Sequence, residues 1–345
     1  MKIIKPFALA LTASFALTSC LDDDGSGTTP VEPTGNVDLY VTNHTNGNVT
    51  KLDLIRNSVT TYTNAAVDTE GIYYSEDDDS FTQVERSPAV QLSTFLDVNV
   101  DVDNTIDTSV SVTSSFSTDL TDGLTSPRDL AVNGNFYVVS DNAPVGGDDT
   151  KGRFFIYTRA DDSFTLRNIV TVDFKVWGIE FVGNDLYAVV DTTNKLAKFT
   201  NFVGTNTTDA TVAATSTVSI DGIVRTHGLA FDNGTMVLTD IGDAASDSDG
   251  AFNVITSFES AFTSAGDEGT ISAGEQTRVK GASTTLGNPV SVELYSESGL
   301  VLIAELANGG GKVLGFNQIP VTGGDMTPVL SYDLTGASSM YLYEN

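Results

Sequence analysis

Side chains of four different chemical kinds occupy the same position in a repeated sequence pattern. The position lies directly before a short apolar segment, and its occupants are Arg128, Trp177, His227 and Asn288. Guanidinium, indole, imidazole and amide groups hold small ligands through charge, stacking and hydrogen bonds, and ligand pockets combine a few such groups with an apolar wall. Because unlike residues at one repeated position suit a ligand better than a fold, we predict that these four side chains form a ligand-binding site.

An acidic or amide residue also recurs, at the end of the second segment of each repeat. It is Asp141, Asp191 and Asp240 in the clearest repeats, with Asn43 and Glu305 in matching places. A residue that is nearly the same in every repeat indicates a structural role. We interpret these side chains as caps that accept hydrogen bonds from the backbone of the following turn.

One acidic loop is a weak candidate for a metal site. The segment DAASDSDG (243–250) places Asp243, Asp247 and Asp249 at close spacing, with a glycine for a sharp turn. Calcium takes six or more oxygen ligands, and this loop lacks the leading Asp and the distal Glu of an EF-hand. We therefore expect no cofactor, with calcium as the alternative.

Other catalytic patterns are missing from the sequence. It holds two histidines, His44 and His227, in repeats that differ, and no G-x-S-x-G segment that would carry a nucleophilic serine. No phosphate-binding P-loop occurs, and no G-x-G-x-x-G opens a helix. The sequence favours a binding protein over an enzyme.

The elements that must position these residues are short strands. The repeat begins anew about every fifty residues, a period typical of propellers and solenoids. The clearest copies are SPRDLAVNGNFYVVSD (126–141), VWGIEFVGNDLYAVVD (176–191) and THGLAFDNGTMVLTD (226–240). Each reads as a strand, a turn with Gly and Asn, and a second strand, because such turns supply the positive φ of a tight hairpin. Two more strands complete each repeat, and four antiparallel strands make one blade of a β-propeller.

We predict an all-β, six-bladed β-propeller, with seven blades as the alternative. The blades are expected at residues 36–65, 70–118, 126–172, 176–220, 226–285 and 288–333. The tail, 338–345, reads as an inner strand without its partner, and VDLYVTN (37–43) as a second strand without its inner strand. We expect these N-terminal and C-terminal strands to pair and close the ring, because closure removes exposed sheet edges.

The repeats also resemble known propeller families. The recurring apolar strand, glycine turn and strand ending in YVxD resemble NHL repeats, and LYVTNHTNGNVTKLDL (39–54) resembles the YVTN repeat of surface-layer propellers. The resemblance covers most of residues 36–345 and implies a β-propeller. Calcium-dependent lactonases share this fold and hold one cation in the channel with Glu, Asn and Asp. The matching positions here carry Arg128, Trp177 and His227, so we do not transfer those ligands.

The N-terminus reads as an export signal followed by a tether. Residues 1–19 contain a short apolar run after two lysines, and LTSC, which ends at Cys20, resembles the lipobox of bacterial lipoproteins. Residues 20–35 form a polar, acidic tether rich in Gly, Pro and Thr. The acidic run Asp22–Asp24 resembles the surface-export signal of Bacteroidetes lipoproteins. We expect Cys20 to be acylated and to anchor the propeller domain (36–345) to the outer membrane, facing the cell surface or, alternatively, the periplasm.

Charge narrows the class of partner. The formal net charge is −29, which repels phosphate backbones, so we expect no nucleic acid. We expect a monomer that binds a glycan, a small molecule or a protein through the face of its channel. The alternatives are a metal-dependent, lactonase-like hydrolase with a cation in the channel and a structural subunit of a cell-surface complex.

Overall fold

The computed structural model describes residues 35–100, 102, 106–317 and 323–345. The expected signal peptide, Cys20 and all of the tether except residue 35 lie outside these ranges. Within them, no helix has both the length and the apolar character needed to cross a membrane.

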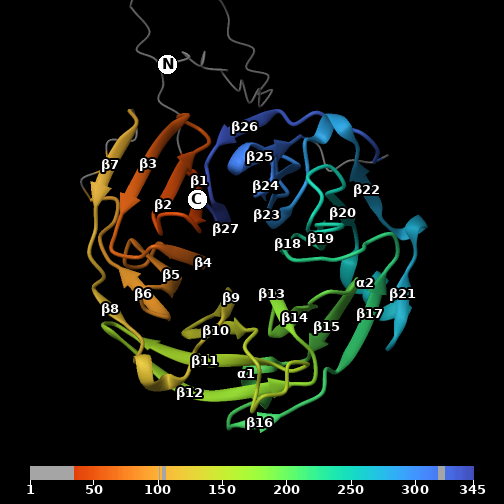
Figure 1. The fold of residues 1–345 in the computed structure, drawn as a ribbon, viewed down its shortest axis with the longest axis horizontal. Coiled ribbons are helices and arrows are strands. Elements are labelled where there is room, and N and C mark those ends of the chain that lie inside the picture. Colours follow the sequence, from red (N-terminus) through yellow and green to blue (C-terminus); the bar gives the residue numbers. More distant parts are fainter. Residues whose placement is uncertain (1–34, 101, 103–105, 318–322) are drawn as a thin grey trace, which may run out of the picture.

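Six small sheets stand in a ring around a central channel (Figure 1). The prediction of six blades is confirmed. Their expected spans differ from the structure at three short strands, Thr108–Ser111, Ala210–Thr211 and Gly269–Ile271, each of which joins the blade before the expected one. Listed from the channel outward, blade 1 contains β27 (Ala337–Glu344), β1 (Val37–Asn43), β2 (Val49–Asp53), β3 (Ser58–Thr63) and β7 (Thr108–Ser111). Blade 2 contains β4 (Asp68–Ser75), β5 (Ser80–Ser87), β6 (Gln91–Phe95) and β8 (Phe116–Ser117). Blade 3 contains β9 (Pro127–Asn133), β10 (Phe136–Asp141), β11 (Gly152–Ala160), β12 (Ser163–Val172) and β16 (Ala210–Thr211).

The other three blades continue the ring. Blade 4 contains β13 (Val176–Val182), β14 (Asp185–Val190), β15 (Lys195–Phe199), β17 (Ser216–Ile220) and β21 (Gly269–Ile271). Blade 5 contains β18 (Leu229–Asp232), β19 (Thr235–Asp240), β20 (Ala251–Ile255) and β22 (Thr277–Lys280). Blade 6 contains β23 (Pro289–Tyr295), β24 (Leu300–Glu305), β25 (Lys312–Phe316) and β26 (Leu330–Asp333). Three outermost strands, β7, β16 and β21, pair in parallel with a blade that precedes them in the chain and so tie neighbouring repeats together.

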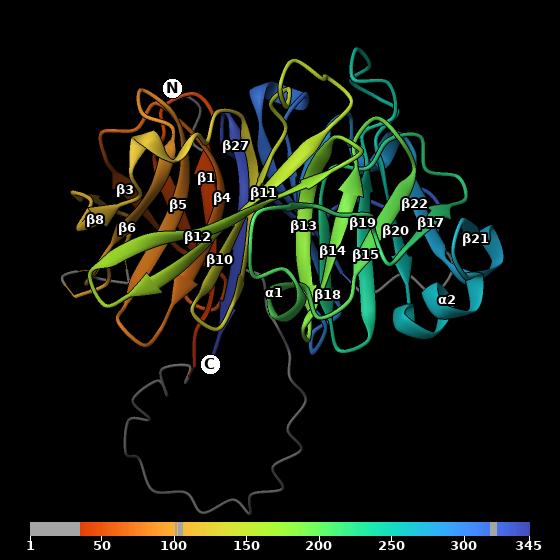
Figure 2. The same ribbon diagram turned by 90° about the horizontal axis from the view of Figure 1, so that it is seen from below.

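Helices are short and peripheral. They are α1 (Phe202–Thr205), α2 (Phe258–Ala265) and single 3₁₀ turns at Leu120–Asp122, Ala273–Glu275, Ala282–Thr284 and Asn308–Gly310. The helix α2 and the strand β21 lie between β20 and β22 in the chain, on the outer edge of the ring (Figure 2).

The tight hairpins follow from the turn residues. In blade 5 the pair Asp232 and Thr235 closes a two-residue loop, Asn233-Gly234. Both loop residues have positive φ, 44° and 79°, which is the backbone of a type I′ turn and matches the twist of the two strands. The Asn-Gly signal in the sequence therefore fixes the register of this inner hairpin.

Each hydrophobic core lies between two blades. The six clusters of buried apolar side chains each combine residues of adjacent blades. Phe154 of blade 3, for example, packs in one cluster with Val176 and Phe199 of blade 4. The cluster between blades 6 and 1 joins Leu302 to Leu39 and Met340. A single blade would leave both of its apolar faces in water, so the ring is the unit that buries them.

The chain ends close the ring as predicted. β1 and β27 pair antiparallel, with Leu39 opposite Leu342. At the ends of this ladder the Asn36 N–H donates to the Asn345 carbonyl at 3.4 Å and the Asn345 N–H donates to the Asn36 carbonyl at 3.1 Å. The last strand of the chain therefore becomes the inner strand of the first blade.

Candidate functional site

The four predicted side chains meet at one end of the channel. Arg128, Trp177, His227 and Asn288 all line a cavity of about 470 Å³. Two residues that we did not predict complete the set, so that every blade contributes one. We call these six residues the rim ring. In order of blades 1 to 6 they are Ser338, Glu70, Arg128, Trp177, His227 and Asn288.

Glu70 carried a signal in the sequence that we did not use. It precedes Gly71-Ile72 as Trp177 precedes Gly178-Ile179, but the rest of the second repeat departs from the pattern. Ser338 lies in the isolated C-terminal strand, where no following strand marks the repeat. Glu70 belongs to the rim ring because blade 2 stands beside blade 3, and Ser338 belongs to it because the ring closes.

Glycines let the inner strands approach each other behind the rim. A Cβ atom on Gly178 would lie 2.2 Å from the carbonyl oxygen of His227, and one on Gly228 would lie 2.8 Å from Cα of Ser291. Real Cβ atoms do not come this close to backbone. Glycine at these positions therefore brings Trp177 of blade 4 within reach of His227 of blade 5.

Trp177 holds two of its neighbours by stacking. Its indole lies parallel to the His227 imidazole, with ring centroids 3.9 Å apart and 7° between the planes. The Arg128 guanidinium carbon lies 4.4 Å from the same indole centroid, within the range of a cation–π contact. The indole of Trp177 on blade 4 thus positions the guanidinium of Arg128 on blade 3 and the imidazole of His227 on blade 5.

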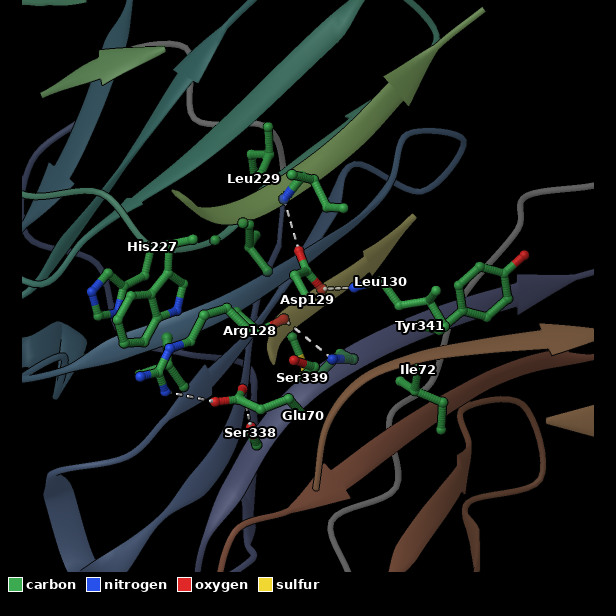
Figure 3. A pocket seen from close by; sticks show the side chains of 18 of the residues that line it. Glu70, Ile72, Arg128, Asp129, Leu130, His227, Leu229, Ser338, Ser339 and Tyr341 are labelled. Atoms are coloured by element: carbon green, nitrogen blue, oxygen red, sulfur yellow. Dashed lines mark hydrogen bonds and ion pairs between the residues drawn. The ribbon is translucent and has the colours of Figure 1, made fainter. Parts of the chain in front are cut away.

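Glu70, on blade 2, interacts with several charged and polar side chains at the rim. Its Oε1 lies 3.2 Å from Nη1 of Arg86 and 3.7 Å from Nη1 of Arg128. The Ser338 hydroxyl donates to Oε2 at 3.0 Å, and Figure 3 shows Arg128 and Ser338 on either side of this carboxylate. Burial raises the pKa of Glu70, and the nearby His44 and two arginines oppose that rise. This network holds Arg128 from its second side.

His227 is neutral because it is buried. Only 5% of its surface is exposed, and burial lowers the pKa of its imidazole, with the charge of Arg225 adding to the effect. The Asp191 carboxylate lies 3.7 Å from Nε2, beyond hydrogen-bond distance, and its presence opposes the lowering of the His227 pKa. Asp191 also accepts two hydrogen bonds from Arg225. Burial alone would raise the pKa of Asp191, but His227 and Arg225 together hold it at about 2.

Three of the four predicted residues carry buried polar atoms that have no hydrogen-bond partner in the described part of the chain. These atoms are Nε of Arg128, both ring nitrogens of His227 and Oδ1 of Asn288. Buried polar groups in proteins are nearly always hydrogen-bonded. Their gathering around one cavity marks the rim ring as a place that can satisfy a ligand.

Three carboxyl groups line the same cavity beyond the rim. They belong to Asp129 on β9, Glu180 on β13 and Glu293 on β23. Burial raises the pKa of Asp129 to about 7 and that of Glu180 to about 8, where the charge of Asp129 adds to the rise. Burial also raises the pKa of Glu293 well above its ordinary value, and Glu180 and Asp129 raise it further. Sequence reasoning did not single out these residues.

The recurring acidic residues act as turn caps, as we interpreted them. Asp141 accepts hydrogen bonds from the backbone N–H groups of Thr125, Ser126 and Ala143. Glu305 in blade 6 does the same for four backbone N–H groups, among them those of Gly287 and Asn288. Three of these caps also bind an arginine: Asp141 binds Arg153, Asp191 binds Arg225 and Asp240 binds Arg278.

The weak metal candidates lie in a loop between β19 and β20, and none of the three is among the residues that line the cavity. Asp249 accepts a hydrogen bond from the backbone N–H of Asp243, and Asp243 accepts one from Ala245. The carbonyl of Asp247 accepts a hydrogen bond from the side-chain amide of Asn308. Across the described ranges, no three His, Cys, Asp or Glu side chains are grouped so that they could hold a metal ion.

Comparison with known proteins identifies the fold alone. No family model matches the chain, and no curated protein matches it. Among solved structures, it is similar to a chain in the crystal structure of a nidogen/laminin complex, with a TM-score of 0.55 and 11% sequence identity over 89% of this chain and 98% of that one. The designed protein Ika8 gives a TM-score of 0.44 at 11% identity over 87% of this chain and 86% of that one.

Proposed function

We propose that this protein is a non-enzymatic binding module that takes a small polar ligand at the rim ring. The observation that carries the proposal is the set of unpartnered atoms on Arg128, His227 and Asn288 around one cavity. A ligand with hydrogen-bonding groups would satisfy atoms that are otherwise costly to bury. The cavity volume, about 470 Å³, falls within the range of small-molecule sites.

The arrangement of Trp177 favours a small polar ligand over a glycan. Sugar rings bind proteins by stacking on exposed aromatic faces. Here His227 and Arg128 both lie on the indole of Trp177, so the indole serves to position them. Contact with the ligand then falls to polar atoms, which suits a compact molecule with several hydrogen-bonding or charged groups.

The hydrolase alternative has less support. A lactonase-like reaction needs several oxygen ligands around one cation in the channel. The rim ring places Arg128 there, and the described residues offer no grouping of three His, Cys, Asp or Glu side chains that could share a metal ion. The nidogen/laminin complex is an example of a similar fold in a protein assembly, which agrees with a role in binding.

We further propose that the module is attached to the outer membrane by a lipid on Cys20 and faces the cell surface. The lipobox-like LTSC, the single cysteine and the acidic tether support this. In cells, the full-length chain should be found in the membrane fraction and be sensitive to added protease. The Cys20→Ala variant should leave that fraction. Retention of Cys20→Ala in the membrane would exclude acylation as the anchor.

The binding function can be tested with the protein's own reporter. Trp177 is the only tryptophan, so its fluorescence monitors the rim ring without a label. A panel of amino acids, carboxylates, amines and simple sugars should contain compounds that change this fluorescence and raise the melting temperature, because a ligand that binds only the folded state stabilises it.

Variants decide whether the response comes from the rim. Arg128→Met and Asn288→Ala should weaken binding at least about tenfold, the loss expected for a charged or buried hydrogen bond. Lys151→Gln, a control at an exposed surface pair, should bind as the unaltered protein does. If the compounds bind both rim variants with unchanged affinity, or if none changes the emission of Trp177, the proposed function is wrong.

A further inference from the structure

Glu180 and Glu293 lie deeper in the channel than the rim ring, whereas Asp129 directly follows the rim residue Arg128. Glu180 lies three positions after Trp177, and Glu293 five positions after Asn288, along inner strands that line the channel. A strand rises roughly 3.3 Å per residue, so these carboxyls lie on the order of 10 Å from the rim. Blade 6 stands opposite blade 3 in the ring, so Glu293 faces the side of the channel that carries Asp129 (Figure 1).

Among the residues that the structure describes, no cationic side chain forms an ion pair with Asp129, Glu180 or Glu293. Asp129 accepts hydrogen bonds from the backbone N–H groups of Leu130 and Ile179, both at 2.9 Å, as Figure 3 shows. The carboxyl of Glu293 accepts one hydrogen bond, from the backbone N–H of Leu342. The carboxyl group of Glu180 has no hydrogen bond or ion pair with any residue that the structure describes, whereas its backbone pairs with Tyr187 of β14. An uncompensated carboxylate in an enclosed channel is costly.

The groups that face this depth are acids and phenols. They come from every inner strand that surrounds it and are Tyr73 (β4), Asp129 (β9), Glu180 (β13), Asp232 (β18), Glu293 (β23) and Tyr341 (β27). The raised pKa values of Asp129, Glu180 and Glu293 follow from this crowding and from burial. A positively charged group placed among them would relieve both effects.

The rim has the opposite character. Among the residues that line the cavity there, Arg86 and Arg128 carry positive charge against the single carboxylate of Glu70. Nε of Arg128 has no partner in the described ranges. His227 is buried in the wall of the same cavity, and neither of its ring nitrogens has a hydrogen-bond partner in the described ranges, although the Asp191 carboxylate lies 3.7 Å from Nε2. Its neutral imidazole supplies one N–H donor to an anion.

We infer that the cavity binds a small zwitterion, a molecule with an ammonium group among Asp129, Glu180 and Glu293 and a carboxylate at Arg128 and His227. This assignment rests on the proposed function, because it names the ligand class of the same site. An organic ammonium suits the carboxyls better than a bare metal ion, since they are not grouped closely enough to share one. An ammonium can donate hydrogen bonds to several separate acceptors.

The proton balance of binding follows from the carboxyl groups. At neutral pH, Asp129 and Glu180 are partly or largely protonated in the free protein, because their pKa values are about 7 and about 8. An ammonium favours their ionised forms. Binding therefore releases protons, and affinity rises as the pH rises through this range. A ligand held only at the rim would not show this linkage.

Matched probes separate the two ends. The series is glycine, 4-aminobutanoate and 6-aminohexanoate, with butanoate and butylamine as single-charge controls, measured by Trp177 fluorescence and by calorimetry in two buffers of different ionisation enthalpy. We expect one amino acid to bind at least about tenfold more tightly than either control, with net proton release. Glu180→Gln should reduce its affinity to about that of butanoate, and Arg128→Met to about that of butylamine. Glu259→Gln, on the exposed face of α2, is the charge-matched control and should change nothing.

The outcomes distinguish this inference from the proposed function. If butanoate binds as tightly as every amino acid and Glu180→Gln has no effect, the zwitterion is excluded while binding at the rim stands. If binding of the amino acid releases no protons and does not depend on pH, the ammonium does not lie among the carboxyls and the inference fails. If no probe and no compound of the wider panel responds to Arg128→Met, the proposed function fails as well. Because Glu180→Gln could alter folding, its melting temperature is measured alongside.

Discussion

The indole of Trp177 and the imidazole of His227 stack at 3.9 Å with 7° between their planes. This contact joins two blades at the mouth of the channel. It helps to bury the imidazole, and burial lowers the pKa of His227 and favours the neutral ring, although Asp191 opposes this effect. A buried neutral histidine beside the only tryptophan gives the site a built-in pH reporter.

Trp177 fluorescence should therefore follow the protonation of His227. Because the folded pKa is lowered from 6.5, the transition should fall below pH 6.5 in the folded protein. The unfolded chain binds this proton at higher pH, so stability should decrease as the pH falls below 6.5. His227→Gln should remove the fluorescence transition and part of the stability loss. A transition that persists unchanged in His227→Gln would contradict the assignment.

Glu180 should produce the opposite pH dependence. Its pKa is about 8 in the folded protein against an ordinary value of 4.5, so the folded state holds a proton that the unfolded state has lost. Stability should then decrease as the pH rises from about 4.5 to 8. Glu180→Gln should flatten this decrease and, near pH 9, stabilise the protein by about 2 kcal/mol. Urea unfolding across this pH range measures the free energy of unfolding, and Glu259→Gln should keep the pH profile of the unaltered protein.

The blades were predictable from the sequence because the residue pattern of each repeat indicates its own strands and turns. Turn residues such as Asn233-Gly234 and caps such as Asp141 act within one repeat or between adjacent strands. A short stretch of sequence is therefore enough to predict them. The same locality exposed Arg128 and Trp177 as occupants of one position. The pairing of the chain ends followed because each end lacked the strand that the other supplies.

The acidic residues deep in the channel could not be predicted in this way. Glu180 and Glu293 belong to repeats separated by more than a hundred residues, and they meet only because the ring closes. Neither position has an acidic counterpart in every blade, so no repeated pattern marks them. The contact of Glu70 with Arg128 likewise joins two repeats, those of blades 2 and 3. Sequence periodicity describes one blade, whereas these contacts depend on how different blades are arranged.

Close packing of the inner strands should make Gly178 intolerant of a side chain. In Gly178→Ala the new Cβ would lie 2.2 Å from the His227 carbonyl oxygen, and relieving that clash must move one inner strand. We expect a loss of about 2 kcal/mol or more in the free energy of unfolding, with altered Trp177 emission. Gly274→Ala is the matched control, because its Cβ would meet nothing closer than 4.0 Å. Equal stability of the two variants would show that the strands are not held this tightly.

Ring closure by β27 should be essential for stability. A chain ending at Gly336 loses the inner strand of blade 1, which leaves β1 with an unpaired edge and removes Met340 from the core between blades 6 and 1. Exposed edges and apolar faces promote aggregation. We expect this variant to melt far below the full chain or to aggregate. A synthetic peptide of residues 337–345, added in excess, should restore the melting temperature by pairing with β1. If the truncated chain melts as the full chain does, closure of the ring does not hold the propeller together.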